Sequence, residues 1–179
     1  MHRLIVPLIS ILYLSHCEPS FSATSKQSYL GSSSASALGN IDLVIVTKST
    51  SRMALIRNGK VMRQYRIALG GRPKGHKLEE GDQRTPEGRY TLDYKKYDSA
   101  YYRAIHISYP NHEDQLRANA LGINPGGLIM IHGQSPNSSH SAKKIQQYNW
   151  TDGCIAITNQ QMDELWRSIR VGTPIEIWP

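Results

Sequence analysis

Short runs of apolar and β-branched residues dominate the chain from Ile41 onward. The run IDLVIVTK at residues 41–48 is typical of a buried strand, and residues 52–71 hold two more strands around Asn58-Gly59. Asn-Gly between such runs is the strongest short-range signal of a β-hairpin. These segments predict a three-stranded meander that ends at Gly70-Gly71.

The second half of the chain combines further strands with two short helices. Strands are expected from about Arg89, over residues 104–110 and 128–131, and at 175–177. A helix over 112–121 is expected between an Asn111 cap and Gly122. A second helix begins at Thr158 or Asn159, stops at Gly172-Thr173-Pro174, and has apolar residues with helical spacing: Met162, Leu165, Trp166 and Ile169. The pattern predicts a mostly β fold with a few short helices.

The N-terminus has the pattern of an export signal. An apolar run over residues 4–14 follows Arg3, and this run is too short to span a bilayer. We expect a signal peptide over residues 1–23 and a location in the periplasm or cell envelope. An uncleaved anchor is an alternative, and so is lipid anchoring at Cys17, although His16 departs from the lipobox pattern.

The remaining chain is long enough for one sizeable core. Residues 24–40 are rich in Ser, Ala and Gly and predict a flexible linker before a single domain over residues 41–179. The formal net charge is +7, which suits an anionic polymer such as cell-wall material or a membrane surface. Because no Lys/Arg run is present and the chain carries an export signal, we expect no nucleic-acid partner. We expect a monomer.

Cys154 is a candidate nucleophile. The chain has two cysteines, and if Cys17 leaves with the signal peptide, Cys154 is the remaining thiol in an oxidising compartment. A thiol needs a base or cation beside it to react at neutral pH, and His132 follows an expected strand. Gly153 lets the backbone approach a substrate carbonyl, so that nearby amides can stabilise an oxyanion. The alternative is a buried structural cysteine and a hydrogen-bonded structural histidine.

The order of five segments resembles a known family. IALGG, GDQRTPEG, HISYPN, PGGLIMIHG and TDGCIAITNQQMDELW resemble the L,D-transpeptidase catalytic domain, or YkuD domain, over residues 41–179. The resemblance implies a β-sandwich-like fold and a cysteine enzyme that acts on peptidoglycan stem peptides without a metal or organic cofactor. It implies that Cys154 is the nucleophile, His132 the base, and Gly133 the residue whose carbonyl orients the imidazole. Gly153 and the Cys154 amide match the oxyanion-hole region.

The resemblance also implies a reaction. The thiolate attacks the carbonyl on the L-centre of the third stem residue, expels the terminal D-alanine, and leaves a thioester. A stem-peptide amine then gives a 3-3 cross-link, water gives a trimmed stem, and a wall-linked protein is a further acceptor. We expect the stem amine.

The chain departs from the commonest family motif, which is Ser-His-Gly-Cys followed by an apolar residue and Arg. Here Asp152 replaces the second histidine and Ala156 replaces the arginine, so a basic group near the substrate carboxylates is missing and the acceptor stays open. Asp152 could contact an amine of the substrate or cap a turn by bonding backbone N–H groups, and we favour the cap.

Four more residues are candidates for substrate binding. Arg84 could bind a stem carboxylate or tie its own loop together through Asp82 or Glu87. His106 and Tyr109 could line the cleft or pack a strand against a loop. Trp150 could form a stacking wall or a core anchor.

Two other classes of protein remain open. A zinc hydrolase would draw on the histidines and Asp152, although no pair has tight metal spacing, and the candidates are His106, His112, His132, His140 and Asp152. A non-catalytic wall-binding domain with a decayed site is the other class. The retention of both Cys154 and His132 favours the enzyme.

Overall fold

The computed structural model describes residues 38–135 and 141–179. The expected signal peptide over residues 1–23 and nearly all of the expected linker therefore lie outside the described residues. Within the described ranges, the elements in chain order are β1 (Leu43–Thr47), β2 (Arg52–Arg57), β3 (Lys60–Arg66), β4 (Gly88–Ser99), β5 (Tyr102–Ile107), α1 (His112–Leu121), β6 (Met130–His132), α2 (Ala142–Ile145), β7 (Ile155–Ala156), α3 (Asn159–Ser168) and β8 (Thr173–Trp178). The fold is mostly β, as the sequence pattern predicts.

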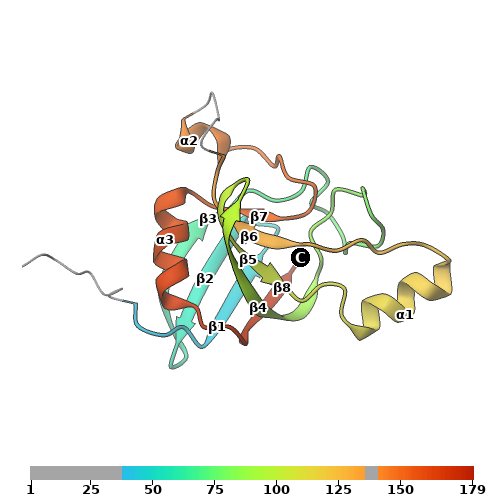
Figure 1. Cartoon of the computed structure of the whole chain (residues 1–179), viewed down its shortest axis with the longest axis horizontal. Coiled ribbons are helices and arrows are strands. Elements are labelled where there is room, and N and C mark those ends of the chain that lie inside the picture. Colours follow the sequence, from blue (N-terminus) through green and yellow to red (C-terminus); the bar gives the residue numbers. More distant parts are fainter. Residues whose placement is uncertain (1–37, 136–140) are drawn as a thin grey trace, which may run out of the picture. The chain divides into compact units, whose positions relative to one another are not determined.

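All these strands belong to one sheet (Figure 1), in the order β3-β2-β1-β8-β4-β5-β6-β7. The β1–β2–β3 meander turns at Asn58-Gly59, where both residues have positive φ. β8 runs parallel to β1 and antiparallel to β4, so the C-terminal strand joins the meander to the rest of the sheet. β6 and β7 form a second parallel pair at the far edge.

The sheet curls until its two edges approach each other. After β3 the chain crosses to β7, where Ala68 and Ala156 exchange backbone hydrogen bonds of 2.9 and 2.8 Å. Gly70 forms a further bridge with Thr151. The curl lets two parts of one sheet enclose the core, which accounts for the sandwich-like character expected of this fold.

Helix α3 packs into that core through the apolar stripe seen in the sequence. Met162 and Leu165 are fully buried, and Trp166 is nearly so. Thr158 caps the helix in a capping box with Gln161. The helix ends at Ser168 rather than near Gly172, because Ile169 adopts an extended backbone that turns its side chain into the core.

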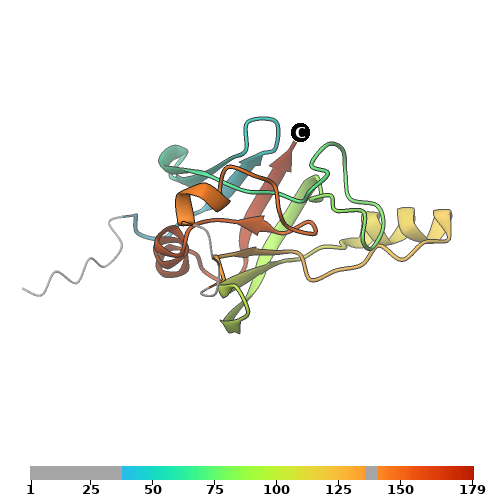
Figure 2. The same ribbon diagram turned by 90° about the horizontal axis from the view of Figure 1, so that it is seen from above.

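Helix α1 has the predicted bounds and caps but packs differently. Asn111 and Asp114 form a capping box, and Gly122 ends the helix in the left-handed conformation. The helix extends away from the sheet in both views (Figures 1 and 2), and its buried residues are Asp114 and Ala118. Among residues 38–135 and 141–179, no helix has the length and apolar character needed to cross a membrane.

Candidate active site

The pairing of β6 with β7 brings Cys154 next to the strand that carries His132. Ile131 pairs with Ile155 and His132 with Ala156, so Cys154 lies beside Met130. The Met130 N–H donates a hydrogen bond to the Cys154 Sγ at 3.4 Å, and the thiol lies 3.7 Å from the Leu128 carbonyl oxygen. The strand expected at residues 128–131 begins two residues later, because Leu128 has a φ of +54°.

Cys154 and His132 line the same cavity, which has a volume of about 360 Å³. Its walls come from the β4–β5 hairpin on one side and the approach to β6 on the other. The other lining residues are Tyr94, Lys96, Ser99, Tyr101, Ala104, Leu128 and Met130. The cavity is therefore mostly apolar and aromatic around the thiol and the imidazole.

The His132 ring is buried and held in one tautomer. Its Nδ1 lies 2.7 Å from the Gly133 carbonyl oxygen, which can only accept, so Nδ1 carries the proton and Nε2 is free to accept one. The rings of Tyr101 and Trp150 lie 4.7 and 5.6 Å from the imidazole. Burial lowers the pKa of His132, against an opposing effect of the Gly133 hydrogen bond.

The pKa of the Cys154 thiol is shifted in the opposite direction. Burial raises the pKa of Cys154, the Met130 N–H lowers it, and the Asp152 carboxylate raises it further. The resting pair is therefore a thiol next to a neutral imidazole rather than a preformed ion pair. In this state the Nε2 atom of His132 is able to accept a proton.

Thr151 makes the turn contacts expected of Asp152. The Thr151 Oγ1 accepts a hydrogen bond from the Gly153 N–H at 3.2 Å and donates to the Cys154 carbonyl at 2.7 Å. Asp152 is exposed. No acceptor is assigned to the Cys154 N–H among the loop and turn hydrogen bonds of residues 38–135 and 141–179, so this amide is a candidate donor to an oxyanion.

The turn that precedes Cys154 requires glycine at position 153. Gly153 has a φ of +129°, and a Cβ there would lie 2.6 Å from the Arg84 carbonyl oxygen and 3.1 Å from Ile129 Cδ1. Gly70 contacts the neighbouring Gln83 carbonyl in the same way. The loop over residues 72–87 thus supports the turn through backbone contacts.

A buried ion pair organises that loop. The Lys77 ammonium donates to the Asp82 Oδ1 at 2.8 Å, and the Asp82 carboxylate also accepts from the backbone N–H groups of Leu78 and Arg84. Although burial pushes the pKa of Asp82 upward, the hydrogen bonds from Lys77 and the backbone hold it below its ordinary range. The Arg84 guanidinium turns back toward the His76 carbonyl, at 3.5 Å, and does not line the Cys154 cavity.

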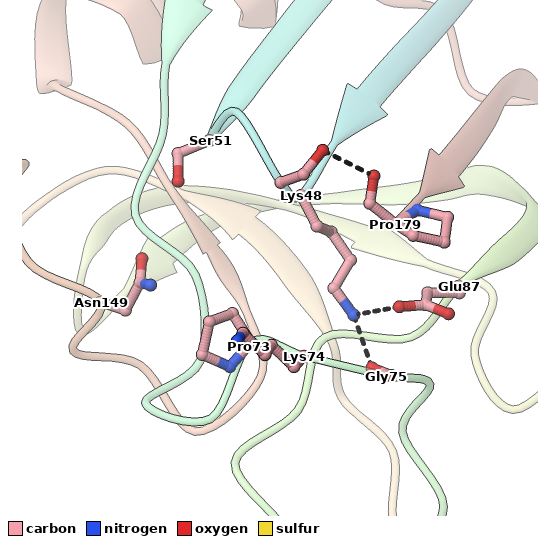
Figure 3. A pocket seen from close by; sticks show the side chains of 9 residues that line it. Lys48, Ser51, Pro73, Lys74, Gly75, Glu87, Asn149 and Pro179 are labelled. Atoms are coloured by element: carbon pink, nitrogen blue, oxygen red, sulfur yellow. Dashed lines mark hydrogen bonds and ion pairs between the residues drawn. The ribbon is translucent and has the colours of Figure 1, made fainter.

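A second cavity, of about 470 Å³, lies where β1 ends (Figure 3). The Lys48 side chain is 3% exposed, and its ammonium donates to the Gly75 and Thr85 carbonyls and to Glu87, at 2.6, 2.8 and 2.8 Å. Three acceptors use its three N–H groups. Lys48 therefore ties the loop to the sheet and has no donor left for a ligand.

The other candidates from the sequence lie around the cavity rather than in it. His106 stacks on Tyr94 at 4.5 Å, and its Nδ1 lies 2.7 Å from an Asp93 oxygen. Tyr109 is buried and donates to the Pro125 carbonyl at 3.0 Å, which fits the strand-packing interpretation. Trp150 packs against His132, and its buried Nε1 has no partner among the described residues.

The residues proposed as zinc ligands do not converge. His106 pairs with Asp93, His112 begins α1, and His132 bonds to Gly133. His140 lies outside the described residues. Within the described ranges no group of three or more His, Cys, Asp or Glu side chains has the arrangement of a metal site.

The sequence interpretation missed the wall formed by the β4–β5 hairpin. Tyr94, Lys96, Tyr101 and Ala104 all line the cavity, yet none was singled out. Tyr94 and Lys96 are two residues apart on a strand, so alternation could have placed them on one face. Which face that is depends on pairing with distant strands.

Comparisons with known proteins agree with this geometry. The model of the L,D-transpeptidase catalytic domain family, YkuD, matches residues 41–177. The Bacillus subtilis protein named "Putative L,D-transpeptidase YqjB" is 30% identical over 138 residues, which cover 75% of this chain and 69% of that protein. The Escherichia coli protein named "Putative L,D-transpeptidase YafK" is 32% identical over 112 residues, covering 62% of this chain.

A solved structure shares the fold. The helical cell shape determining protein Pgp2 from Campylobacter jejuni superposes with a TM-score of 0.59 at 27% identity, over 78% of this chain. The chain spans 48% of the length of that protein and 38% of the Escherichia coli relative. The similarity thus covers less than half of the length of these two proteins.

Proposed function

This chain belongs to the YkuD family of L,D-transpeptidase catalytic domains, and we propose that it is an exported cysteine L,D-transpeptidase acting on peptidoglycan tetrapeptide stems. The observation that carries the proposal is the shared cavity of Cys154 and His132, with the imidazole Nδ1 held by the Gly133 carbonyl. This family acts on stem peptides of peptidoglycan, and a net charge of +7 suits that anionic polymer. The N-terminal apolar run supports a location in the periplasm or cell envelope.

The first half-reaction acylates Cys154. His132 Nε2 accepts the thiol proton as Sγ attacks the carbonyl carbon of the third stem residue, and the Cys154 N–H donates to the oxyanion. The bond to the terminal D-alanine nitrogen then breaks, and the imidazolium gives its proton to the leaving amine. Free D-alanine and a thioester are the products. The Met130 N–H stabilises the sulfur while it carries negative charge.

The second half-reaction releases the acyl group. An amine of a neighbouring stem attacks the thioester, His132 takes the amine proton, and the thiol is regenerated with a 3-3 cross-link as product. Water or the amine of a wall-linked protein would use the same thioester. We propose the stem amine as the acceptor.

Intact-mass spectrometry of the domain, wild type and Cys154→Ala, tests the acylation. One sample of each protein is incubated with a carbapenem, whose β-lactam ring opens onto a nucleophile, and a separate, untreated sample is incubated with disaccharide-tetrapeptides. We expect an adduct on the wild type alone, release of D-alanine, and 3-3 dimers among the products.

Other results would change the assignment. An adduct with tripeptides as the only product would indicate an L,D-carboxypeptidase. Turnover that survives thiol alkylation but is abolished by a chelator would indicate a zinc hydrolase. Neither adduct nor turnover in the wild type would contradict the nucleophilic role of Cys154.

A further inference from the structure

The cavity next to Cys154 has one formally charged side chain among the described residues that line it, Lys96. The remaining walls are phenolic, aliphatic or otherwise neutral, and the lowered pKa of His132 keeps the imidazole neutral at physiological pH. A cation in a mostly apolar cavity attracts an anionic ligand. We propose that Lys96 binds a carboxylate of the stem peptide that acylates Cys154, an inference that rests on the proposed function.

Strand pairing places Lys96 on the same cross-strand row as His132. Lys96 pairs with Ala104 on β5, and Ala104 pairs with His132 on β6. Residues directly opposite each other lie on one face of a sheet, and two strand spacings of roughly 4.8 Å separate their backbones. The small Ala104 side chain lies between them. The row therefore has space for a substrate that reaches from the imidazole to the ammonium.

Lys96 also forms a weak ion pair, so its ammonium can exchange Asp98 for a carboxylate of a ligand. Its contact with Asp98 is a 3.6 Å ion pair in which the Asp98 side chain is 88% exposed. An exposed pair of this kind is weak and competes with water and other anions. A substrate carboxylate can replace Asp98 at little cost.

The other Lys and Arg side chains of β4 and β5 have different surroundings. Lys95 donates to the Trp166 carbonyl at 2.7 Å, Arg103 donates to Asp163 at 2.7 Å, and the exposed Arg89 pairs with Glu176. None of these three lines the cavity. Lys96 is thus the cation from β4 or β5 that faces the reacting groups.

Two carboxylates of a stem peptide have the required chemistry. One ends the terminal D-residue that leaves, and the other is on the side chain of the third residue where that residue is a diamino dicarboxylic acid. An ammonium on a flexible stem accepts a carboxylate in many orientations, so Lys96 suits either. Amidated substrates distinguish the two sources.

The experiment compares Lys96→Met and Lys96→Arg with a control, Lys60→Met, at an exposed position on β3. Each protein is given a tetrapeptide stem with both carboxylates free, with the terminal carboxylate amidated, or with the third side chain amidated. We expect Lys96→Met to raise KM about tenfold on the free stem, with kcat within about threefold of wild type, because a charge-assisted hydrogen bond is lost. Lys96→Arg and Lys60→Met should stay within about threefold in both parameters.

The amidated stems identify the bound group. When the carboxylate that Lys96 binds is amidated, wild type and Lys96→Met should show the same KM, as in a double-mutant cycle. If Lys96→Met has the KM of Lys60→Met on the free stem, the proposal is overturned. The same holds if the tenfold difference persists on both amidated stems.

Binding to the inert Cys154→Ala protein separates this inference from the proposed function. Calorimetry of the free stem with Cys154→Ala, alone and combined with Lys96→Met, needs no turnover. We expect about a tenfold increase in Kd from the lysine substitution even if catalysis follows another route. Equal Kd values would overturn the role of Lys96 while leaving the acylation of Cys154 intact.

Discussion

Burial acts on Cys154 and His132 in opposite directions, because one group becomes charged by losing a proton and the other by gaining one. It raises the pKa of the thiol and lowers the pKa of the imidazole, so both groups are neutral across a wide pH range. In the proposed mechanism this neutral pair keeps the thiol proton available for transfer, first to His132 and then to the leaving amine. Desolvation is the largest cause of both pKa shifts.

This state predicts the pH dependence of acylation. We expect kcat/KM to stay at its maximum below pH 6.5, the ordinary imidazole value, and to fall only when His132 is protonated at its lowered pKa. On the alkaline side, alkylation of Cys154 by iodoacetamide should reach half its maximum rate above the ordinary thiol pKa. Stopped-flow kinetics of acylation measure the acid side of the pH profile. Mass spectrometry of the alkylated protein measures the alkaline side. Half-maximal alkylation below the ordinary thiol pKa would indicate an ion pair instead.

The candidate residues that the sequence could name are those with local surroundings in the chain. His132 and Cys154 lie in short motifs, and the Gly133 carbonyl bonds the His132 ring from the next position. Lys96 was not recognisable, since irregular pairing on both sides of it shifts the register of β4 with β5. The turn contact expected of Asp152 is made by Thr151, whose hydroxyl accepts from the Gly153 N–H at 3.2 Å, while Asp152 is exposed.

At the scale of elements, the loop over residues 72–87 links the stability of the domain to the turn that precedes Cys154. Its backbone contacts Gly70 and Gly153, and its own shape depends on the Lys77–Asp82 pair, whose side chains are 3% and 8% exposed. Removing one partner of a buried pair leaves an uncompensated charge. The Lys77 ammonium also lowers the pKa of Cys154.

Lys77→Met should therefore alter both stability and reactivity. We expect a loss of about 3–5 kcal/mol in the free energy of unfolding and a further rise in the alkylation pKa of Cys154. Lys74→Met, at an exposed position of the same loop, is the matched control and should change neither. Urea denaturation and the alkylation profile provide the two readouts. If Lys77→Met matches Lys74→Met in both the free energy of unfolding and the alkylation pKa, the Lys77–Asp82 pair does not support the turn before Cys154.

Helix ends match the positions expected from the sequence where nearby residues cap the helix. They differ where contacts with distant residues end the helix. Asn111 and Gly122 bound α1 as expected, since a capping box and a left-handed glycine involve nearby backbone groups. The C-terminus of α3 is set by Ile169, whose buried side chain requires an extended backbone. Periodicity alone could not foresee that termination.

At the scale of the whole domain, the curl of the sheet places the two halves of the site. The β1–β2–β3 meander and the apolar stripe of α3 could be predicted from periodicity. The bridge between Ala68 and Ala156 could not, because it joins residues far apart in the chain. No local pattern encodes that register. Closure of the sheet also buries His132, and burial changes how the folded state responds to acid.

The stability of the domain should fall in two stages as pH decreases. His132 is neutral in the folded state and protonates below pH 6.5 in the unfolded chain, so the unfolded state gains protons first and the free energy of unfolding drops from that pH downward. Asp82 and Asp114 have lowered pKa values in the folded state through their hydrogen bonds, despite burial. Their stabilisation is complete above the ordinary aspartate value of about 3.9 and is lost as pH falls through the folded values.

A single substitution separates the two stages. Urea denaturation of wild type and His132→Gln at pH 7.5, 5.5 and 3.5 should show a smaller decrease between the first two values in the variant, since Gln does not titrate. The decrease between the last two should also be smaller in the variant, because the folded imidazole of wild type stays neutral until the pH reaches its lowered pKa, and the loss that both proteins share arises from Asp82 and Asp114. If the variant loses as much stability as wild type between pH 7.5 and 5.5, the buried imidazole is not the group that senses acid first.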